Sequence, residues 1–152
     1  MTKGSTRRSF LKKITSACAV GVAISLQSTV SFAKKAGDML SRIKGTVIHK
    51  TDKFYEVWRE GMTWYVRKPK RYPQTMVLAT STQDVINAVN YARENGLKVS
   101  IRSTGHSISA SHLRDDSVMI DLSQLREVSF DAEAQTAWLQ PGMRAQEFQE
   151  LA

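Results

Sequence analysis

The residues best suited to chemistry lie together in one short segment, Arg102-Ser103-Thr104-Gly105-His106-Ser107. Small side chains and a glycine allow a tight turn whose successive backbone N–H groups point inward, and such a nest binds diphosphate oxygens. His106 places an unhindered imidazole beside this anion site. The segment is not the dinucleotide fingerprint of a Rossmann domain, because no glycine-rich helix start follows it. Taken alone, the six residues also fit an ordinary histidine in a surface loop.

The segments before this turn predict a strand, a helix and a second strand. Residues 76–79 form a short apolar run after a proline, which predicts a buried strand. Ser81 is suited to a helix N-cap, and Asp84 stands three residues later in a capping-box position. The helix is expected to stop at Asn95-Gly96. Apolar and polar residues then alternate over 97–102, as in a strand, which completes a βαβ unit with a right-handed crossover.

The segments after the turn predict further β-structure and a closing helix. Residues 118–122 form another apolar run, typical of a strand. Residues 128–130 and 134–139 predict a hairpin across Asp131-Ala132-Glu133. Pro141-Gly142 ends it, and a helix begins near Ala145 with neither a glycine stop nor a basic last turn. The predicted class is α+β, and the chain is expected to stop within an element.

Together these motifs resemble the FAD-binding PCMH-type domain of the vanillyl-alcohol oxidase and berberine-bridge-enzyme superfamily. The resemblance runs from Tyr72 to Leu151 and keeps the family's order of motifs. It implies that residues 72–152 are the N-terminal subdomain of such a domain, a small mixed sheet with a βαβ unit, incomplete at the C-terminus. The matching segments are Tyr72-Pro73, Ser81-Thr82-Gln83-Asp84-Val85, Tyr91-Ala92-Arg93, Asn95-Gly96-Leu97, Gly105-His106-Ser107, Val118-Met119-Ile120-Asp121-Leu122-Ser123 and Gly142.

The resemblance implies FAD as cofactor and a covalent bond between His106 and the flavin 8α carbon. The electron-poor flavin ring makes that carbon open to attack by a neutral imidazole nitrogen. Thr104 stands where the family commonly has the first of two adjacent glycines. The expected cofactor-binding residues, which contact the diphosphate or flank the loop, are Arg102, Ser103, Thr104, Gly105, His106, Ser107 and Ile108.

The function implied by the resemblance is that of an FAD-dependent oxidoreductase, an oxidase or dehydrogenase. Hydride would pass from a small-molecule substrate to flavin N5. The catalytic base and substrate pocket are expected beyond Ala152, so the fragment alone is expected to be inactive. Three alternatives stay open: a non-catalytic exported binding module, a truncated remnant of the enzyme, and an enzyme that holds flavin noncovalently.

Residues 1–33 resemble a twin-arginine signal peptide. Arg7-Arg8 precede an apolar doublet and a lysine, and Ser31-Phe32-Ala33 offers a signal-peptidase site. The apolar stretch 14–26 is too short and too polar to span a bilayer, so no stable membrane anchor is expected. Thr15 disfavours lipid attachment at Cys18. The expected partner is the twin-arginine export machinery and the expected location is periplasmic or extracellular; a basic amphipathic helix is the alternative.

The positive charge of the chain is concentrated in the first 33 residues. They carry five basic and no acidic residues, which leaves residues 34–152 with 17 basic and 14 acidic residues and no cysteine. This excludes disulfides and thiol chemistry there and argues against nucleic-acid binding. Residues 34–71, basic and aromatic, predict an irregular lead-in that Pro69 and Pro73 keep extended or turned. Stacking on a nucleic acid is the disfavoured alternative.

The other titratable clusters predict no site. His112 is expected to be a solvated loop residue, with an approach to the cofactor as the alternative, and His49 a polar strand or loop residue. Asp115-Asp116 is expected to form a turn, because no third metal ligand stands at a suitable spacing. No metal site is therefore expected.

Overall fold

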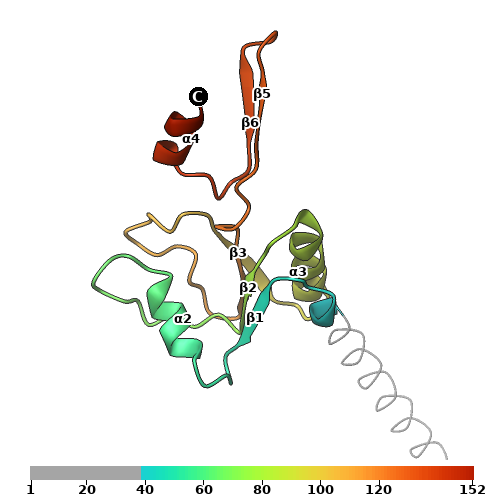
Figure 1. Cartoon of the computed structure of the whole chain (residues 1–152). Helices are drawn as coiled ribbons and strands as arrows, with labels where there is room; N and C mark the ends of the chain where they lie inside the picture. The colour runs from blue at the N-terminus through green and yellow to red at the C-terminus, as the bar shows by residue number, and fades with distance from the viewer. Residues whose placement is uncertain (1–38) are drawn as a thin grey trace, which may run out of the picture. The chain divides into compact units, whose positions relative to one another are not determined.

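The computed structural model describes residues 39–152. The predicted signal peptide, residues 1–33, lies outside the described residues. These described residues form a four-stranded sheet in the order β1-β2-β4-β3 and a separate two-stranded sheet, β5-β6 (Figure 1). The elements are β1 Thr46–His49, α2 Tyr55–Gly61, β2 Thr75–Leu78, α3 Thr82–Glu94, β3 Lys98–Arg102, β4 Ser117–Asp121, β5 Val128–Asp131, β6 Thr136–Leu139 and α4 Ala145–Leu151.

The four-stranded sheet has parallel and antiparallel pairs, as predicted. β2 runs parallel to β4 and β4 parallel to β3, whereas β1 is antiparallel to β2. The predicted βαβ unit is therefore confirmed as β2-α3-β3, with β4 inserted between its two strands. The register pairs Leu78 and Arg102 with Asp121, one on each side. The last residues of three parallel strands thus meet at one edge of the sheet.

The two central strands, β2 and β4, are buried on both faces. Met76, Leu78 and Met119 pack on the face covered by α2, and Val77 and Ile120 pack on the other. Figure 1 shows α2 and α3 on opposite sides of this sheet. A strand buried on both faces reads as a continuous apolar run, which is the pattern of residues 76–79 and 118–120.

The N-terminus of α3 is held by Asp84 in a way that a capping box does not predict. Ser81 Oγ accepts a hydrogen bond from Asp84 N at 3.2 Å, as an N-cap does. The Asp84 carboxylate turns instead to the backbone N–H groups of Thr80 and Lys44, each at 2.9 Å, and of Gly45 at 3.2 Å. Burial alone would raise the pKa of Asp84, but these hydrogen bonds outweigh it and lower the pKa below 3.8. One carboxylate thus ties the residues before β1 to the start of α3.

The prediction of an irregular lead-in over residues 34–71 is wrong, because this part of the chain contains β1 and α2. β1 joins the main sheet, with Ile48 buried in the core. α2 ends at Gly61, eight residues before Pro69, so the prolines act only on the segment that follows the helix. Both elements are too short to show a clear period in sequence, and their stability comes from packing on the sheet.

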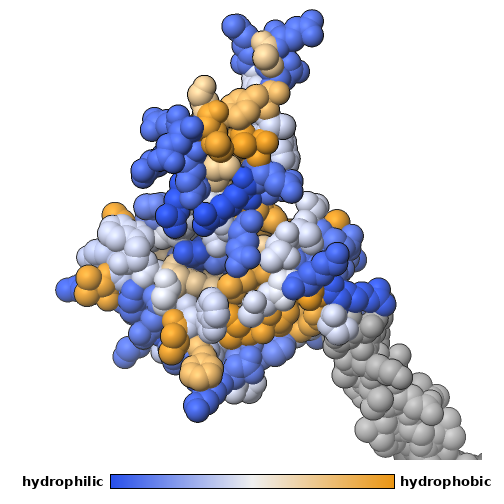
Figure 2. All heavy atoms as spheres, in the orientation of Figure 1, coloured by the Kyte–Doolittle hydropathy of each residue, from blue (hydrophilic) through white to orange (hydrophobic). Residues whose placement is uncertain are grey.

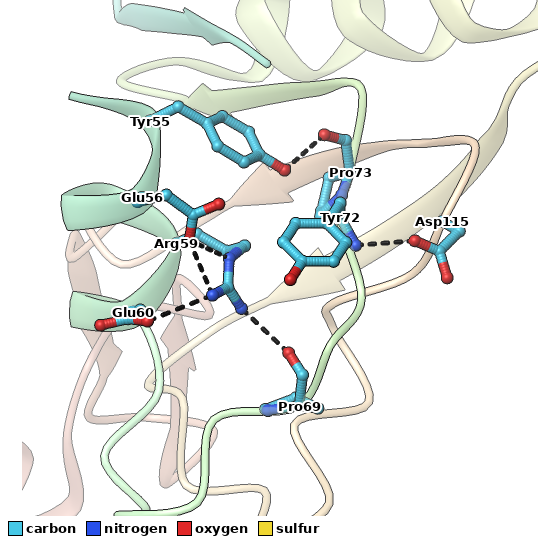
Figure 3. A network of polar contacts seen from close by, with 8 residues as sticks. All are labelled: Tyr55, Glu56, Arg59, Glu60, Pro69, Tyr72, Pro73 and Asp115. Carbon is cyan, nitrogen blue, oxygen red and sulfur yellow. Dashed lines mark hydrogen bonds and ion pairs between the residues drawn. The ribbon is translucent and has the colours of Figure 1, made fainter. Parts of the chain in front are cut away.

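Polar contacts fix α2 and the loop after it to the start of β2 (Figure 3). The buried Tyr55 hydroxyl donates to Pro73 O at 2.6 Å, and burial raises its pKa to about 12. Arg59 Nη1 donates to Pro69 O at 2.9 Å, and its guanidinium lies 4.8 Å from the Tyr72 ring centroid. Asp115 accepts a hydrogen bond from Tyr72 N at 2.8 Å. The loop between α2 and β2 is therefore closed at its base.

The predicted hairpin and closing helix are both present. β5 pairs antiparallel with β6, although the turn lies over residues 132–135 rather than 131–133. α4 is joined to this region by the stacked rings of Phe130 and Phe148, 5.9 Å apart, and by an Arg126–Glu147 ion pair of 3.0 Å. Figure 2 shows apolar atoms on the surface where these elements lie. None of the helices in residues 39–152 has the length and apolar character needed to cross a bilayer.

Candidate functional site

A cavity of about 710 Å³ opens at the carboxyl end of β3, where the sequence predicted an anion-binding turn. Three segments far apart in the chain line it: the end of α2 and the loop after it, the turn after β3, and the start of α4. The lining includes two arginines and no carboxylate. Such a cavity favours an anionic ligand. Its lining residues are Gly61, Trp64, Arg102, Thr104, Gly105, His106, Met143, Arg144, Ala145 and Gln146.

The turn requires glycine at position 105. Gly105 has φ +80°, in the left-handed region that favours glycine. A Cβ built there would lie 2.8 Å from Arg102 Nε and 2.9 Å from Nη2. Thr104 is not among the described residues with positive φ, so its β-branched side chain replaces a family glycine without backbone strain. The turn thus brings its backbone close to a neighbouring side chain at Gly105.

Arg102 lies next to this turn, and its guanidinium binds a carboxylate and a backbone carbonyl of the protein. Nη1 pairs with Asp121 Oδ2 at 2.6 Å, and Nε donates to Met62 O at 2.9 Å. The Arg102 side chain is 16% exposed and that of Asp121 3% exposed. Charge-assisted hydrogen bonds of this kind are short and directional. Arg102 therefore joins the ends of β3, β4 and α2 and supports the turn from below, besides lining the cavity.

The seven predicted cofactor-binding residues divide into two groups. Arg102, Thr104, Gly105 and His106 line the cavity, and the His106 side chain is exposed. The other three, Ser103, Ser107 and Ile108, are not among the lining residues. The Ser103 hydroxyl donates to Pro141 O, Ser107 Oγ lies 3.1 Å from Ser109 Oγ, and Ile108 is exposed. The structure therefore uses Ser103 and Ser107 to connect and brace the loop.

Gly142 lies close to the end of β4, and this contact positions the residues that form the third wall of the cavity. A Cβ at Gly142 would lie 2.5 Å from Leu122 O and 2.7 Å from Leu125 O, so only glycine fits. Its N–H donates to Leu125 O at 2.8 Å. Together with the Ser103–Pro141 hydrogen bond, this contact places residues 143–146 opposite the turn.

Sequence reasoning missed the residues of the other two walls. Gly61 and Trp64 belong to the predicted lead-in, and Met143 to Gln146 precede or begin the last helix. Trp64 stood within the aromatic cluster whose nucleic-acid interpretation was disfavoured. Arg144 had no local signal at all, because an isolated arginine near a helix start fits a solvated position equally well.

The prediction that His112 is a solvated loop residue is wrong. His112 is 3% exposed, and its Nε2 lies 3.4 Å from Thr63 Oγ1. Burial lowers its pKa below 6.5, and so do the charges of Arg102 and Arg71, whereas Asp121 opposes them. The cause is the loop over residues 110–113, whose Ala110 and Leu113 pack in the core on the α2 face of the sheet. His112 does not line the 710 Å³ cavity.

The predictions for His49 and for Asp115-Asp116 agree with the structure. His49 ends strand β1, and its backbone N–H donates to Asp52 Oδ2 at 2.8 Å. Asp115-Asp116 forms a turn, in which Asp116 has φ +52°. Within residues 39–152 no group of three or more His, Cys, Asp or Glu side chains is placed to hold a metal ion.

Comparison with known families gives a match over the C-terminal half of the chain. Residues 73–152 match the model of the FAD binding domain. The chain belongs to this family. Its α+β structure is that of the PCMH-type FAD-binding domain, of which it contains a fragment, and its cofactor is FAD.

Relatives and solved structures agree with this assignment. The FAD-linked oxidoreductase janO of Penicillium janthinellum is 35% identical over 77 residues, 51% of this chain and 17% of that protein. The reticuline oxidase of Eschscholzia californica is 32% identical over 72 residues, 46% of this chain and 13% of that protein. The crystal structure of 6-hydroxy-D-nicotine oxidase from Arthrobacter nicotinovorans matches with a TM-score of 0.61 and 27% identity, covering 71% of this chain and 23% of that one. The chain thus spans less than a quarter of the length of each of these relatives.

The residues of the cavity fit the diphosphate of FAD. Thr104 and Gly105 line the cavity, so the backbone of the turn can contact a diphosphate there. The lining includes two arginines and no carboxylate that would repel the phosphates. Because the Arg102 guanidinium already pairs with Asp121, Arg144 is the cation best suited to neutralise the bound diphosphate.

Proposed function

We propose that this chain is the FAD-binding part of an FAD-dependent oxidoreductase, an oxidase or dehydrogenase, with His106 as a covalent attachment point for the flavin. The proposal rests on one observation above all. His106 is exposed in the same cavity as the Gly105 turn, so one imidazole lies beside the place suited to the cofactor's diphosphate. The named FAD-linked oxidoreductases among its relatives support the reaction class.

Each part of the chain has a separate task in this proposal. Bound flavin would accept a hydride from a substrate C–H bond. The backbone at Thr104 and Gly105 would contact the diphosphate, and Arg144 would neutralise its charge. Arg102 would hold the turn in place through Asp121. The catalytic base and substrate pocket would come from residues beyond Ala152.

The role of His106 would be to tether the cofactor rather than to move protons during turnover. His106 would hold the flavin through a bond from one ring nitrogen to the 8α carbon. Such a bond needs a neutral, accessible imidazole, and the exposure of His106 meets the second condition.

The test is to replace His106 in the full-length protein. His106→Ala should abolish flavin bound to acid-precipitated polypeptide, while noncovalent binding persists because the turn contributes backbone groups. His49→Ala, at the end of β1 and outside the cavity lining, is the matched control and should keep covalent flavin.

Four outcomes would contradict parts of the proposal. Flavin that stays on the precipitated His106→Ala polypeptide would place the attachment elsewhere. Wild-type protein that releases all its flavin into acid would be a noncovalent flavoenzyme. A soluble, folded protein without any flavin would be a non-catalytic binding module. A single lesion after codon 152 in an otherwise open downstream frame would indicate a truncated remnant.

We further propose that the twin-arginine machinery exports the protein to the periplasm or beyond. This rests on the pattern around Arg7-Arg8 in the sequence. Because that pathway recognises the guanidinium pair rather than positive charge alone, replacing both arginines by lysine should retain the precursor in the cytoplasm. Normal delivery of the lysine variant would identify an ordinary secretory signal instead.

A further inference from the structure

Trp64 lies outside the segment that matches the FAD-binding family, yet it lines the cavity that contains His106. It is 58% exposed, and its ring contacts Tyr65 edge-on, with centroids 5.8 Å apart. Indole rings supply large, rigid faces on which planar ring systems stack. We propose that Trp64 makes an aromatic contact with the flavin ring of the FAD that binds beside His106. This inference rests on the proposed function.

The two residues before Trp64 contact Arg102 and His112, which lie on either side of the Gly105 turn. Met62 and Thr63 are both buried. Met62 O accepts the 2.9 Å hydrogen bond from Arg102 Nε, and Thr63 Oγ1 lies 3.4 Å from His112 Nε2. The arginine that supports the turn therefore also holds the segment that carries Trp64. Arg102 thus lies beside both the segment before Trp64 and the turn before His106.

The loop that follows Trp64 is held at its other end as well. Arg59 Nη1 donates to Pro69 O at 2.9 Å, and Lys68 Nζ donates to Thr63 O. Figure 3 shows the arginine reaching from α2 to Pro69. An exposed tryptophan on a loop held at both ends is an ordered surface, which lowers the entropy cost of contacting a ligand.

The composition of the cavity favours the flavin ring over the diphosphate as the contact of Trp64. Arg144 and Arg102, the latter paired with Asp121, are the cationic groups of the lining, and Trp64 provides its largest aromatic face. His106, the proposed attachment point of the flavin ring, lines the same cavity. Trp138, 61% exposed on β6, is not in the lining and serves as the matched control.

The experiment measures reversible FAD binding in the full-length His106→Ala protein. Trp64→Leu should raise the dissociation constant for FAD about tenfold, which corresponds to about 1.4 kcal/mol. It should leave the dissociation constant for ADP, which lacks the flavin ring, unchanged. Trp64→Phe should stay within about threefold of the parent, because it keeps an aromatic face. Trp138→Leu should have no effect on either ligand.

A second measurement covers the case in which the His106→Ala protein binds too weakly. In the covalent wild-type background, Trp64→Leu should increase flavin fluorescence, because contact with an indole quenches it, and Trp138→Leu should not. An unchanged FAD dissociation constant, equal losses for FAD and ADP, or unchanged flavin emission would each overturn the contact. Absence of flavin from the wild-type protein would instead overturn the proposed function.

Discussion

Replacing Gly105 by alanine tests how closely Arg102 packs against the turn over residues 103–106. The new methyl group would lie 2.8 Å from Arg102 Nε and 3.1 Å from Cζ. An arginine end is normally flexible enough to move away. This one is held by a 2.6 Å bond to Asp121 and a 2.9 Å bond to Met62 O, so moving it breaks at least one of them.

The expected cost has two parts. A side chain in the left-handed region costs about 1–2 kcal/mol. Losing one partner of a buried ion pair costs about 3–5 kcal/mol. Asp121 keeps the N–H of Ser123 as a donor at 2.8 Å, so the lower end applies. We therefore expect Gly105→Ala to destabilise the protein by about 4 kcal/mol in total.

Gly96→Ala separates the two parts, because Gly96 also has positive φ, +63°, but no atom within 4 Å of a built Cβ. Its cost should be the strain alone, about 1–2 kcal/mol. The assay is denaturant unfolding of the full-length protein without FAD, for both variants and in an Arg102→Met background. There, the costs of the two alanines should become similar. Equal costs in the wild-type background would refute the reasoning, because the guanidinium would then move freely.

Three further predictions concern stability and folding. Asp84→Asn should destabilise the protein at pH 7, and its difference in unfolding free energy from wild type should shrink as pH falls below 3.8 through the lowered pKa of Asp84. Denaturant unfolding at each pH measures this difference. A constant difference would contradict the assigned hydrogen bonds. Wild-type stability should fall as pH drops below 6.5 towards the lowered pKa of His112, and His112→Asn should flatten that decline in the same assay. Residues 34–152 expressed alone should aggregate or stay dynamic without flavin, because Ile101 and Trp138 are among many exposed apolar side chains, and a monomeric fragment with a cooperative melting transition would contradict this.

Local sequence determined the elements from Tyr72 onwards. A continuous apolar run predicted β2, an N-cap serine and Asn95-Gly96 bounded α3, and two alternating segments predicted the hairpin. These signals act over a few residues, through backbone preference, capping and side-chain period. The glycine of the turn was also predictable, because a small-residue turn before an imidazole is a local feature.

Local sequence did not predict which face of a strand is buried or which distant residues pack together. Alternation over β3 correctly indicated a strand, but Val99 and Ile101 are exposed while Ser100 is buried. β3 is an edge strand, and α3, which packs on the face that carries Val99 and Ile101, leaves both side chains exposed. The burial of His112 likewise depends on the loop packing under α2, which no periodicity in sequence reports.

The sequence by itself predicted a tight, glycine-containing turn that ends in a histidine and follows a βαβ unit. Only the tertiary structure decided what surrounds that turn. The strand order β1-β2-β4-β3 places the end of β4 beside the end of β3, so Asp121 meets Arg102 across nineteen positions of sequence. Met62, forty positions before Arg102, meets the same guanidinium. The walls of the cavity come from contacts between distant segments, and such contacts depend on packing geometry that local residue preferences do not encode.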